Sequence, residues 1–424
     1  MNQKQAPKPT PRKRPSVKDR QGKPSAPRRT PYRSASKPAA TGIDASAAIQ
    51  GLASRPIVIA VAAAIVVLIA LVAISLATCG KGQEAAEAPE APAANPYKHE
   101  GPFSLTFAST GDLMFAREVG TFVDAHGGAA ALANVADELS APDVTIANVE
   151  APLTNDESDA LIGKDVYWMS RPAGIDALKA AGIDVVSLAN NHIMDYGAAG
   201  LRDTLEALDG AGILHAGAGL TESTASEPAE LEVNGVRIAF FSWTDIIPDN
   251  FLAYGEGAGV VSARMNMADA CKRVSEAKET HDIVIVAMHW GVEYQAYIDE
   301  AQQQVPAHQL VDAGADVIVG NHPHVIEGIE FYNGALISYS QGDFVCDHYS
   351  QETGESFILN FTLTQDGVRD VSATPVYLDD EHGIPSIVTG DHAQSILTRL
   401  EEISSGMNSS FTVENDVAYI KPAA

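Results

Sequence analysis

Two histidines near residue 320 have the spacing of a metal-binding pair. They flank a proline in the segment Gly320-Asn321-His322-Pro323-His324. In an extended backbone, residues i and i+2 face the same side, and proline stiffens the step between them. Both imidazoles are therefore expected to point toward one place, where they could hold a cation.

Four other short segments place metal-binding side chains directly after an apolar run. Burying an unpaired carboxylate or imidazole at the end of an apolar run costs free energy. Because such residues recur at the ends of several runs in this chain, they indicate a binding site. The candidate residues are Asp112, then Asn148 and Glu150, then Asn190, Asn191, His192 and Asp195, and then His289 and Glu293. Taken singly, each could belong to a turn, a helix cap or the core. Together they predict one shared site.

The apolar runs before these residues are expected to be strands. Expected strands span residues 105–109, 144–147, 185–188, 231–233, 236–243, 283–288, 317–319 and 336–339. Helical patterns over 129–139, 175–181 and 201–208 alternate with them, as is typical of an α/β domain. Residues 357–363 and 368–376 flank Gln365-Asp366-Gly367 and predict a hairpin that closes one edge of a sheet. A helix over 395–403 and a strand over 417–420 are expected in a C-terminal extension, residues 381–424.

The donor set predicts the kind of metal. In α/β folds the carboxyl ends of parallel strands gather at one edge of the sheet, where ligands bind. Carboxylate, amide and imidazole groups meeting there would suit one or two ions of Mn, Fe or Zn better than Ca or Mg. A thiolate site is not expected, because the chain has only three cysteines. Cys271 and Cys346 are expected to be lone thiols, with a bridge between them as the alternative.

The N-terminal part of the chain differs in composition from the rest. Residues 1–55 hold 13 Lys and Arg against two Asp, and predict a basic, disordered cytoplasmic tail. Residues 56–79 predict a transmembrane helix, because the uncharged residues 57–78 would span roughly 33 Å as a helix, enough to cross a bilayer core. Residues 80–101, rich in Ala, Glu and Pro, predict a linker.

The basic tail predicts the orientation of this anchor. Positive charge up to Arg55 marks the cytoplasmic side, so the domain of residues 102–380 is expected outside the cytoplasm. A cleaved signal peptide is an alternative, although its apolar stretch would be only about 7 to 15 residues long. A lipoprotein cleavage site before Cys79 is another. The tail itself is either a topology signal or a contact for anionic lipid or nucleic acid.

The remainder of the chain is strongly acidic. The whole chain has 28 basic and 55 acidic residues, of which 13 basic and 2 acidic residues lie in residues 1–55. The rest of the chain therefore has 15 basic and 53 acidic residues, a net charge near −38. Such a domain will not attract nucleic acid. It will also repel a polyanionic substrate, except where a metal ion or local Arg and Lys residues reverse the field.

The order of these motifs resembles that of a known family. The motifs are Gly111-Asp112, Asn148-Val149-Glu150, residues 187–192 followed by Asp195-Tyr196-Gly197, Met288-His289-Trp290-Gly291, residues 320–325, and Tyr339-Ser340-Gln341-Gly342-Asp343-Phe344. They are similar to the successive motifs of the bacterial capsule synthesis protein family, also called CapA or poly-gamma-glutamate synthesis proteins. The resemblance runs from about Ser104 to Leu378.

The resemblance implies a fold and a set of roles. The family is similar to calcineurin-like metallophosphoesterases, which implies a four-layer α/β/β/α sandwich with two metals at strand ends. It implies metal ligation by Asp112, Asn191, His289, His322 and His324, with Glu150 at the bridging position. His192 would be catalytic, oriented by Asp195. Substrate-binding or supporting roles would fall to Asn148, Trp290, Glu293, Tyr294 and Asp343.

Two departures from the family pattern affect this site. Phosphoesterases usually carry Asp-x-His in the first motif, whereas this chain has Asp112-Leu113-Met114 and lacks the histidine. The last motif has Asp343 where the family commonly has Asn, which adds negative charge. A site that lacks one ligand could bind one metal, or bind polymer without cleaving it.

Two functions are consistent with these features. The first is a membrane-anchored, extracytoplasmic role in biosynthesis or export of a capsule or poly-gamma-glutamate exopolymer. Its partners would be the anionic polymer or its precursor and the membrane components of the synthesis machinery, with no nucleic acid. The alternative is an active metal-dependent phosphoesterase that hydrolyses a cell-envelope substrate, with metal-activated water as nucleophile and His192 as general acid.

Overall fold

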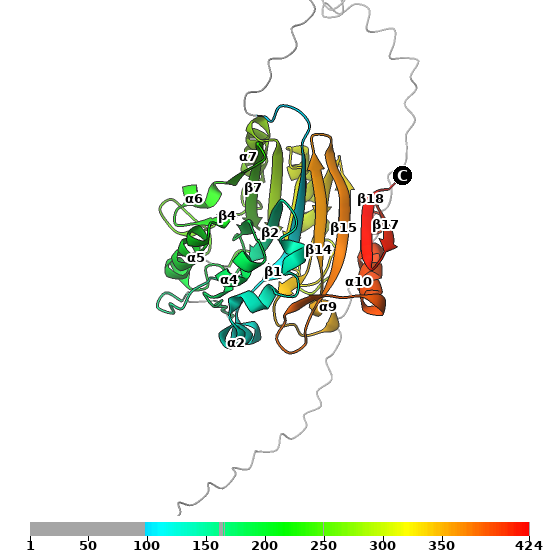
Figure 1. Ribbon diagram of the computed structural model, residues 1–424. Coiled ribbons are helices and arrows are strands. Elements are labelled where there is room, and N and C mark those ends of the chain that lie inside the picture. The colour runs from blue at the N-terminus through cyan, green and yellow to red at the C-terminus, as the bar shows by residue number, and fades with distance from the viewer. Residues whose placement is uncertain (1–97, 161–163, 165, 249, 424) are drawn as a thin grey trace, which may run out of the picture. The chain divides into compact units, whose positions relative to one another are not determined.

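A computed structural model describes residues 98–160, 164, 166–248 and 250–423 (Figure 1). Two large β-sheets dominate this part of the chain. The ten-stranded sheet has the order β17 (Ser409–Glu414), β18 (Val417–Pro422), β15 (Gly367–Leu378), β14 (Glu355–Thr364), β1 (Ser104–Leu113), β2 (Val144–Val149), β3 (Val185–Ser187) and β4 (Leu214–Ala216), with β13 (Asp343–Val345) beside β1 and β16 (Pro385–Ile387) beside β15.

The second sheet has six strands. Their order is β11 (Ile329–Tyr332), β12 (Ala335–Ser338), β10 (Val317–Asn321), β9 (Ile283–His289), β7 (Val236–Thr244) and β6 (Ala229–Val233). A small pair, β5 (Ala218–Gly219) and β8 (Gly259–Val260), stands apart from both sheets. The helical segments are α2 (Arg117–His126), η1 (Gly128–Leu132), α3 (Ala136–Leu139), α4 (Gly174–Ala180), α5 (Gly197–Ala211), α6 (Glu222–Ser226), α7 (Met267–Thr280), η2 (Glu300–Gln304), α8 (Val305–Asp312), α9 (Gln351–Gly354) and α10 (Gly390–Ile403).

The two sheets pack face to face around an apolar core. Phe107 of β1 and Phe361 of β14 stack within it, with their ring centroids 5.2 Å apart. Ile285 of β9 and Val319 of β10 reach the same core from the opposite sheet. Strands such as β2 and β9 are buried along their whole length, because both of their faces are covered.

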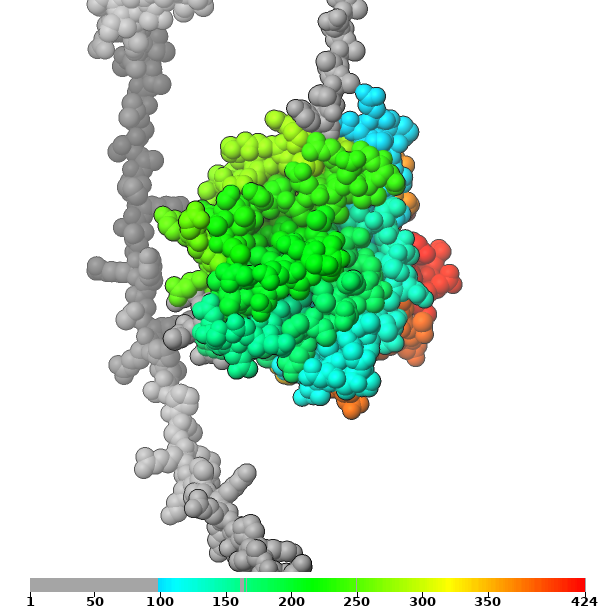
Figure 2. Space-filling view, turned by 60° about the vertical axis from the view of Figure 1, so that its left-hand side comes forward, coloured from blue at the N-terminus to red at the C-terminus, as the bar shows by residue number. Residues whose placement is uncertain are grey.

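Helices cover the outer face of each sheet. Leu178 of α4 and Leu201 of α5 pack in one outer cluster with the alternate residues of β1 to β3. Val274 of α7 and Leu310 of α8 pack against β9 and β10 on the other side. In the space-filling view, the face that carries α5 comes forward as a closed surface coloured green to cyan (Figure 2). The expected α/β class and the four layers in the order helix, sheet, sheet, helix are therefore present.

The parallel strands end at the site predicted from the sequence. β1, β2 and β3 are parallel neighbours, and β13 joins β1 in parallel with Asp112 opposite Asp343. In the second sheet β9 and β10 are parallel, with His289 opposite Asn321. The predicted site residues thus follow strands of two sheets and not of one, because the sandwich brings the carboxyl ends of both sheets to one side.

The structure corrects two expectations about elements. The hairpin of β14 and β15 does not close an edge, because β14 pairs with β1 and β15 pairs with β18. The single helix expected over 129–139 is two short helices, η1 and α3, separated by a turn. The expected helix and strand of the C-terminal extension are present as α10 and β18, and β18 belongs to the ten-stranded sheet.

The expected anchor cannot be compared with the structure. The predicted transmembrane helix of residues 56–79, the basic tail and most of the linker lie outside the described residues. Within the described part of the chain, no helix combines the length and the apolar character needed to cross a bilayer.

Candidate metal centre

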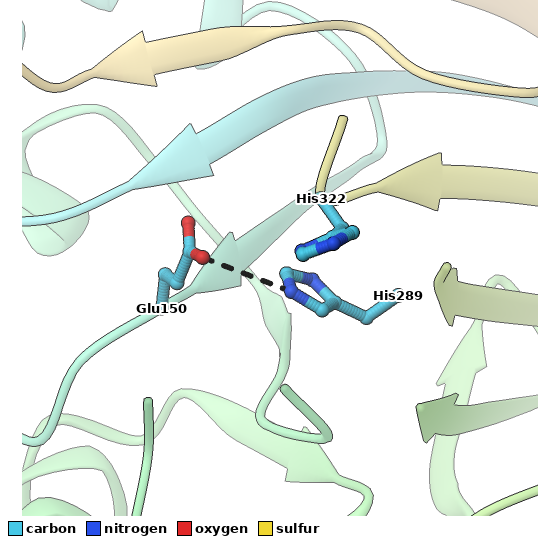
Figure 3. Close-up of side chains that lie close together, drawn as sticks. All are labelled: Glu150, His289 and His322. Carbon is cyan, nitrogen blue, oxygen red and sulfur yellow. Dashed lines mark ion pairs between the residues drawn. The ribbon is translucent and has the colours of Figure 1, made fainter. Parts of the chain in front are cut away.

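One group of predicted ligands joins the two sheets. Glu150 follows β2, His289 ends β9, and His322 follows β10. Figure 3 shows the three side chains converging, and their donor atoms all lie within 4.8 Å of one another. The Nε2 atom of His289 faces both Glu150 Oε1 at 3.7 Å and Asn191 Oδ1 at 2.8 Å. Two imidazoles, one carboxylate and one amide oxygen are therefore available to a single cation.

A second group lies beside the first and shares Glu150. It contains Asp112, Glu150, His324 and Asp343, whose donor atoms are again within 4.8 Å of one another. His324 Nδ1 lies 2.8 Å from Asp343 Oδ1 and 3.9 Å from Asp112 Oδ2, so one nitrogen faces both carboxylates. Asp343, expected from the sequence only as a supporting residue, thus stands among the possible ligands. A third group of possible ligands combines Glu293 with the two histidines of the His-Pro-His segment.

Local structure fixes the orientation of Asp112. Asn148 donates its side-chain N–H to Asp112 Oδ1 at 2.6 Å, and the backbone N–H of His322 donates to Asp112 Oδ2 at 3.1 Å. Gly111 makes this position possible, because a Cβ there would lie 2.0 Å from the carbonyl oxygen of Gly342. The close approach of β1 and β13 therefore depends on a residue without a side chain.

Unpaired atoms test whether these residues suit a cation. Glu150 Oε1 and His322 Nδ1 are buried without a hydrogen-bond partner in the described part of the chain; His289 Nδ1 is unpaired too, but the nitrogen of that ring that faces Glu150 is Nε2. Buried polar atoms are rarely left unpaired, because each costs desolvation free energy. Their burial beside further carboxylate and imidazole donors fits a divalent cation such as Mn, Fe or Zn.

Burial also disfavours charge on the carboxyl groups. It raises the pKa of Asp112 to about 6, with the neighbouring Asp343 adding to the rise, although His324 and the hydrogen bond from Asn148 oppose it. Burial and the charge of Asp112 raise the pKa of Glu150 well above its usual range. A nearby cation stabilises ionised carboxylates, so this cluster of acids is suited to one.

The imidazoles of the site differ in their titration. Burial and the neighbouring histidines hold the pKa of His289 and of His322 well below the usual range, which keeps both rings neutral and able to donate a lone pair. Burial also acts to lower the pKa of His324. The carboxylates around it, Asp343 and Glu150 foremost, outweigh burial and raise its pKa well above the usual range.

His192 and Asp195 form a pair on the other wall of the site. His192 Nδ1 lies 2.7 Å from Asp195 Oδ2, and because a carboxylate only accepts, Nδ1 donates. Asp195 is fully buried and also accepts from the backbone N–H of Trp168 at 2.7 Å and from the ammonium of Lys164. Burial lowers the pKa of His192 to about 4. Asn190 fixes this turn by accepting the backbone N–H groups of residues 192 and 193.

An open cleft of about 430 Å³ leads to these residues. Glu150, Asn191, His192, His324 and Asp343 line its base, and Glu293 and Tyr294 line its wall. His289 and His322 lie just beneath, buried from solvent. Trp290 does not reach the cleft, because it is fully buried and donates its indole N–H to the carbonyl of Tyr339 at 2.9 Å. The donors therefore face a space that a substrate can enter.

Three charged residues of the cleft were not predicted from the sequence. They are Arg117, Lys164 and Asp347. Arg117 lies five residues after Asp112, and Asp347 lies four after Asp343, so proximity to the two motifs was their only signal. Lys164 lies in the connection between β2 and β3 and follows no strand end. The two cations are notable in a domain with so few.

Comparison with known proteins agrees with the motif order. The profile described as "Bacterial capsule synthesis protein PGA_cap" matches residues 106–348, which contain every candidate ligand. The PGA biosynthesis protein CapA of Bacillus subtilis is 33% identical over 312 residues, covering 73% of this chain and 80% of that protein. The capsule biosynthesis protein CapA of Bacillus anthracis is 34% identical over 300 residues, covering 69% and 72%.

Similarity to solved structures is more remote. A hypothetical protein from Thermus thermophilus matches with a TM-score of 0.39 and 19% identity, covering 64% of this chain and 98% of that one. A 5'-nucleotidase precursor from the same organism matches with a TM-score of 0.39 and 14% identity, covering 71% and 59%. Matches at this level carry no conclusion about chemistry. The profile and the two CapA relatives establish that the chain belongs to the bacterial capsule synthesis protein family, PGA_cap.

Proposed function

We propose that this protein acts in the biosynthesis or export of a capsular or poly-gamma-glutamate exopolymer. The names of the two CapA relatives support this role. The structural observation that carries it is the group of buried carboxylate and imidazole donors at the base of an open cleft. The expected partners are an anionic polymer or its precursor and membrane components of the synthesis machinery.

The proposal includes a membrane anchor and an extracytoplasmic domain. The uncharged stretch of residues 57–78 after a basic tail supports both. Protease added to intact cells stripped of their wall should digest the folded domain and spare the N-terminal tail. Protection of the domain under conditions that digest a known surface protein would contradict this arrangement.

The metal site is proposed to be required for the cellular role. A strain that lacks the protein should lose the polymer, and the wild-type gene should restore it. The variant His322→Ala should fail to restore it, because two possible ion positions lose an imidazole. His215→Ala is the matched control, since His215 lies in β4 and pairs with Asp209 away from the cleft. Polymer production that persists without the protein contradicts the proposed role.

The alternative activity is metal-dependent hydrolysis of a phosphoester. The pair of His192 and Asp195 favours it, because Asp195 orients the ring and leaves Nε2 of His192 directed away from Asp195. The two ligand groups that share Glu150, one with Asp112 and the other with His289, would hold a divalent metal. Such a metal would polarise a substrate oxygen and lower the pKa of bound water. As general acid, His192 would have to take up a proton at Nε2 before passing it to the leaving group, because burial keeps the ring neutral with its single proton on Nδ1.

This activity can be measured on aryl phosphomonoesters and diesters with added Mn. His192→Ala should lower the rate by about 10²- to 10⁴-fold, the usual contribution of a general acid. Its metal content should equal that of the wild type, because His192 belongs to none of the three ligand groups. Equal rates in both proteins would remove the catalytic role of His192.

A further inference from the structure

Backbone conformation separates four residues of this cleft and of its ligand groups from the rest of the domain. Among the described residues other than glycine, eleven have a positive φ, and seven of these are Asn or Asp, which tolerate that conformation. The other four are Arg117, Tyr294, His322 and His324, with φ between 52° and 100°. All four belong to the cleft or to the ligand groups at its base.

A residue keeps such a strained conformation when its position in the structure is needed, although the conformation costs free energy. Unfavourable φ values persist where the surrounding structure holds a residue in place, and they gather at binding and catalytic sites. His322 and His324 are already accounted for as possible metal ligands. Arg117, at the first residue of α2, has no such account, although its φ of 52° is unfavourable for its residue type.

Aromatic rings hold the guanidinium of Arg117 at the cleft wall. Its central carbon lies 4.4 Å from the ring centroid of Trp168 and 5.0 Å from that of Tyr349. The Trp168 ring also lies 5.8 Å from the His192 ring. A continuous row of side chains, from His192 through Trp168 and Arg117 to Tyr349, therefore leads from the proposed metal centre to the rim.

The pairing of Arg117 is incomplete. One guanidinium nitrogen contacts Asp347 Oδ2, whereas Asp347 Oδ1 is buried without a hydrogen-bond partner in the described part of the chain. Arginine has five N–H donors and binds a carboxylate best through two parallel hydrogen bonds. Lys164, the other cation of the cleft, is already bonded to Asp195 and to the carbonyl of Asn191. Arg117 therefore has the donors that an incoming anion would use.

We propose that Arg117 recognises a carboxylate of an anionic polymer that lies across the proposed metal centre. Trp168 and Tyr349 hold the guanidinium flat, and Asp347 competes with the polymer for it. This inference rests on the proposed role in exopolymer synthesis and names the group by which the polymer is bound. A local cation is needed because the acidic domain otherwise repels such a chain.

Binding of a fluorescent oligomer of γ-linked glutamate to the full-length chain, measured by anisotropy with Mn present, tests the proposal. Arg117→Met should weaken binding by about tenfold or more, because a charge-assisted hydrogen bond is lost. Arg117→Lys should bind with intermediate affinity, since it keeps the charge without the planar fork. Arg369→Met is the matched control and should bind like wild type, because Arg369 pairs with Asp366 at the hairpin of β14 and β15.

Two competitors identify the recognised group. The same oligomer with its carboxylates amidated should bind wild type as weakly as the native oligomer binds Arg117→Met. Inorganic phosphate should compete only weakly. Equal affinities of wild type and Arg117→Met for the native oligomer, or no binding by wild type, overturn the inference. Strong phosphate competition that Arg117→Met abolishes overturns the assignment to a carboxylate.

Folding and function are controlled separately. Arg117→Met should keep the wild-type melting temperature and metal content. If Arg117→Met does not fold, the affinity of Arg117→Lys for the glutamate oligomer tests the inference instead. An affinity of Arg117→Lys equal to that of wild type overturns the inference. In the deletion strain, full restoration of polymer by Arg117→Met would contradict the inference and leave the proposed function intact. Polymer made without any copy of the protein would contradict the proposed function itself.

Discussion

Asp343 shows how one side chain can alter a metal site. The first motif has Met114 two residues after Asp112, so it offers no imidazole at that position. Pairing of β1 with β13 sets Asp343 opposite Asp112, and both face His324 Nδ1. Asp343 thus adds a carboxylate to the ligand group that contains Asp112. Because carboxylate oxygens favour harder cations, the group with Asp112 and Asp343 is expected to bind a harder cation than the group with His289 and His322.

Replacing Asp343 should weaken metal binding. Asp343→Asn keeps the size of the side chain and removes its charge, so we expect affinity for Mn to fall by about tenfold or more. Equilibrium dialysis followed by elemental analysis measures this directly. Asp366→Asn, at an exposed turn, is the control and should bind Mn like wild type. Unchanged affinity in Asp343→Asn would mean that this carboxylate is not part of the site.

Glu327 should make the stability of the domain depend on pH. Burial raises its pKa to about 8, although the hydrogen bond from Gln303 at 2.6 Å opposes the rise. The folded protein then keeps a proton that the unfolded chain, with a pKa of 4.5, releases. The free energy of unfolding should therefore fall as pH rises between these two values, by up to about 1.4 kcal/mol per pH unit.

Glu327→Gln should remove this dependence. Denaturant unfolding of both proteins at several values between pH 5 and about 9 gives the difference in the free energy of unfolding. The free energy of unfolding of the variant should increase relative to that of the wild type as pH rises, and this difference should level off above about pH 8. A difference that stays constant with pH would show that Glu327 is ionised in the fold.

At the scale of elements, the site depends on strands that approach closely. β1 passes β13 so tightly that a Cβ on Gly111 would meet the carbonyl of Gly342 at 2.0 Å. β10 passes β12 in the same way, since a Cβ on Gly320 would lie 1.9 Å from the carbonyl of Tyr339. Each contact fixes the ends of neighbouring strands within one of the two sheets. The positions of the donor atoms follow from backbone packing as much as from the donor residues.

Gly111→Ala should therefore disturb both the fold and the site. We expect the free energy of unfolding to fall by about 1–3 kcal/mol, the usual cost of overpacking, and Mn affinity to fall with it. Gly210→Ala in α5 is the control, because no atom lies within 4 Å of the added Cβ and alanine favours a helix. Unfolding in urea measures the first effect. Wild-type stability in Gly111→Ala would contradict the contact seen here.

The strands of this domain were largely predictable, but their arrangement was not. β2 and β9 are entirely buried, so their apolar runs were clear in the sequence. Helix α7 was missed because small alanines, Ala270 and Ala277, provide much of its buried face. The pairing of Ser104 with Thr364 could not be predicted, since it joins residues far apart in the chain. For the same reason the edge position expected for the hairpin of β14 and β15 was wrong.

Some residues of the candidate site were predictable from the sequence and others were not. Carboxylates and imidazoles after buried strands were visible, because such positions rarely hold them without a purpose. Arg117 and Lys164 were not, because basic residues in connections are common and solvated. Their significance arises only from what they contact, namely Trp168 and Asp195.

At the scale of the molecule, charge and metal are linked. The chain carries 55 acidic and 28 basic residues, and four of the acids, Asp112, Glu150, Asp343 and Glu293, belong to the ligand groups. A bound cation would offset repulsion among these carboxylates, so the loaded protein should be the more stable form. A bound metal would therefore stabilise the fold in addition to any role in function.

Removing the metal should lower thermal stability. A chelator should reduce the melting temperature, and excess Mn should restore it, because a ligand at 100 times its Kd stabilises by about 2.7 kcal/mol. His322→Ala should respond much less to either treatment. Differential scanning calorimetry at fixed pH checks this. Identical melting of chelated and Mn-loaded wild type would contradict metal binding by the folded domain.

The order of strands in the larger sheet has a consequence for how the protein is made. β1 lies between β14 and β2, and its first residue pairs with Thr364. During synthesis, the strand that emerges first waits for one that emerges near the end, and such distant pairing slows folding. Until then its backbone edge is unpaired and prone to aggregation. A stop codon before residue 355 would remove that partner and leave an aggregation-prone fragment and not a smaller working protein.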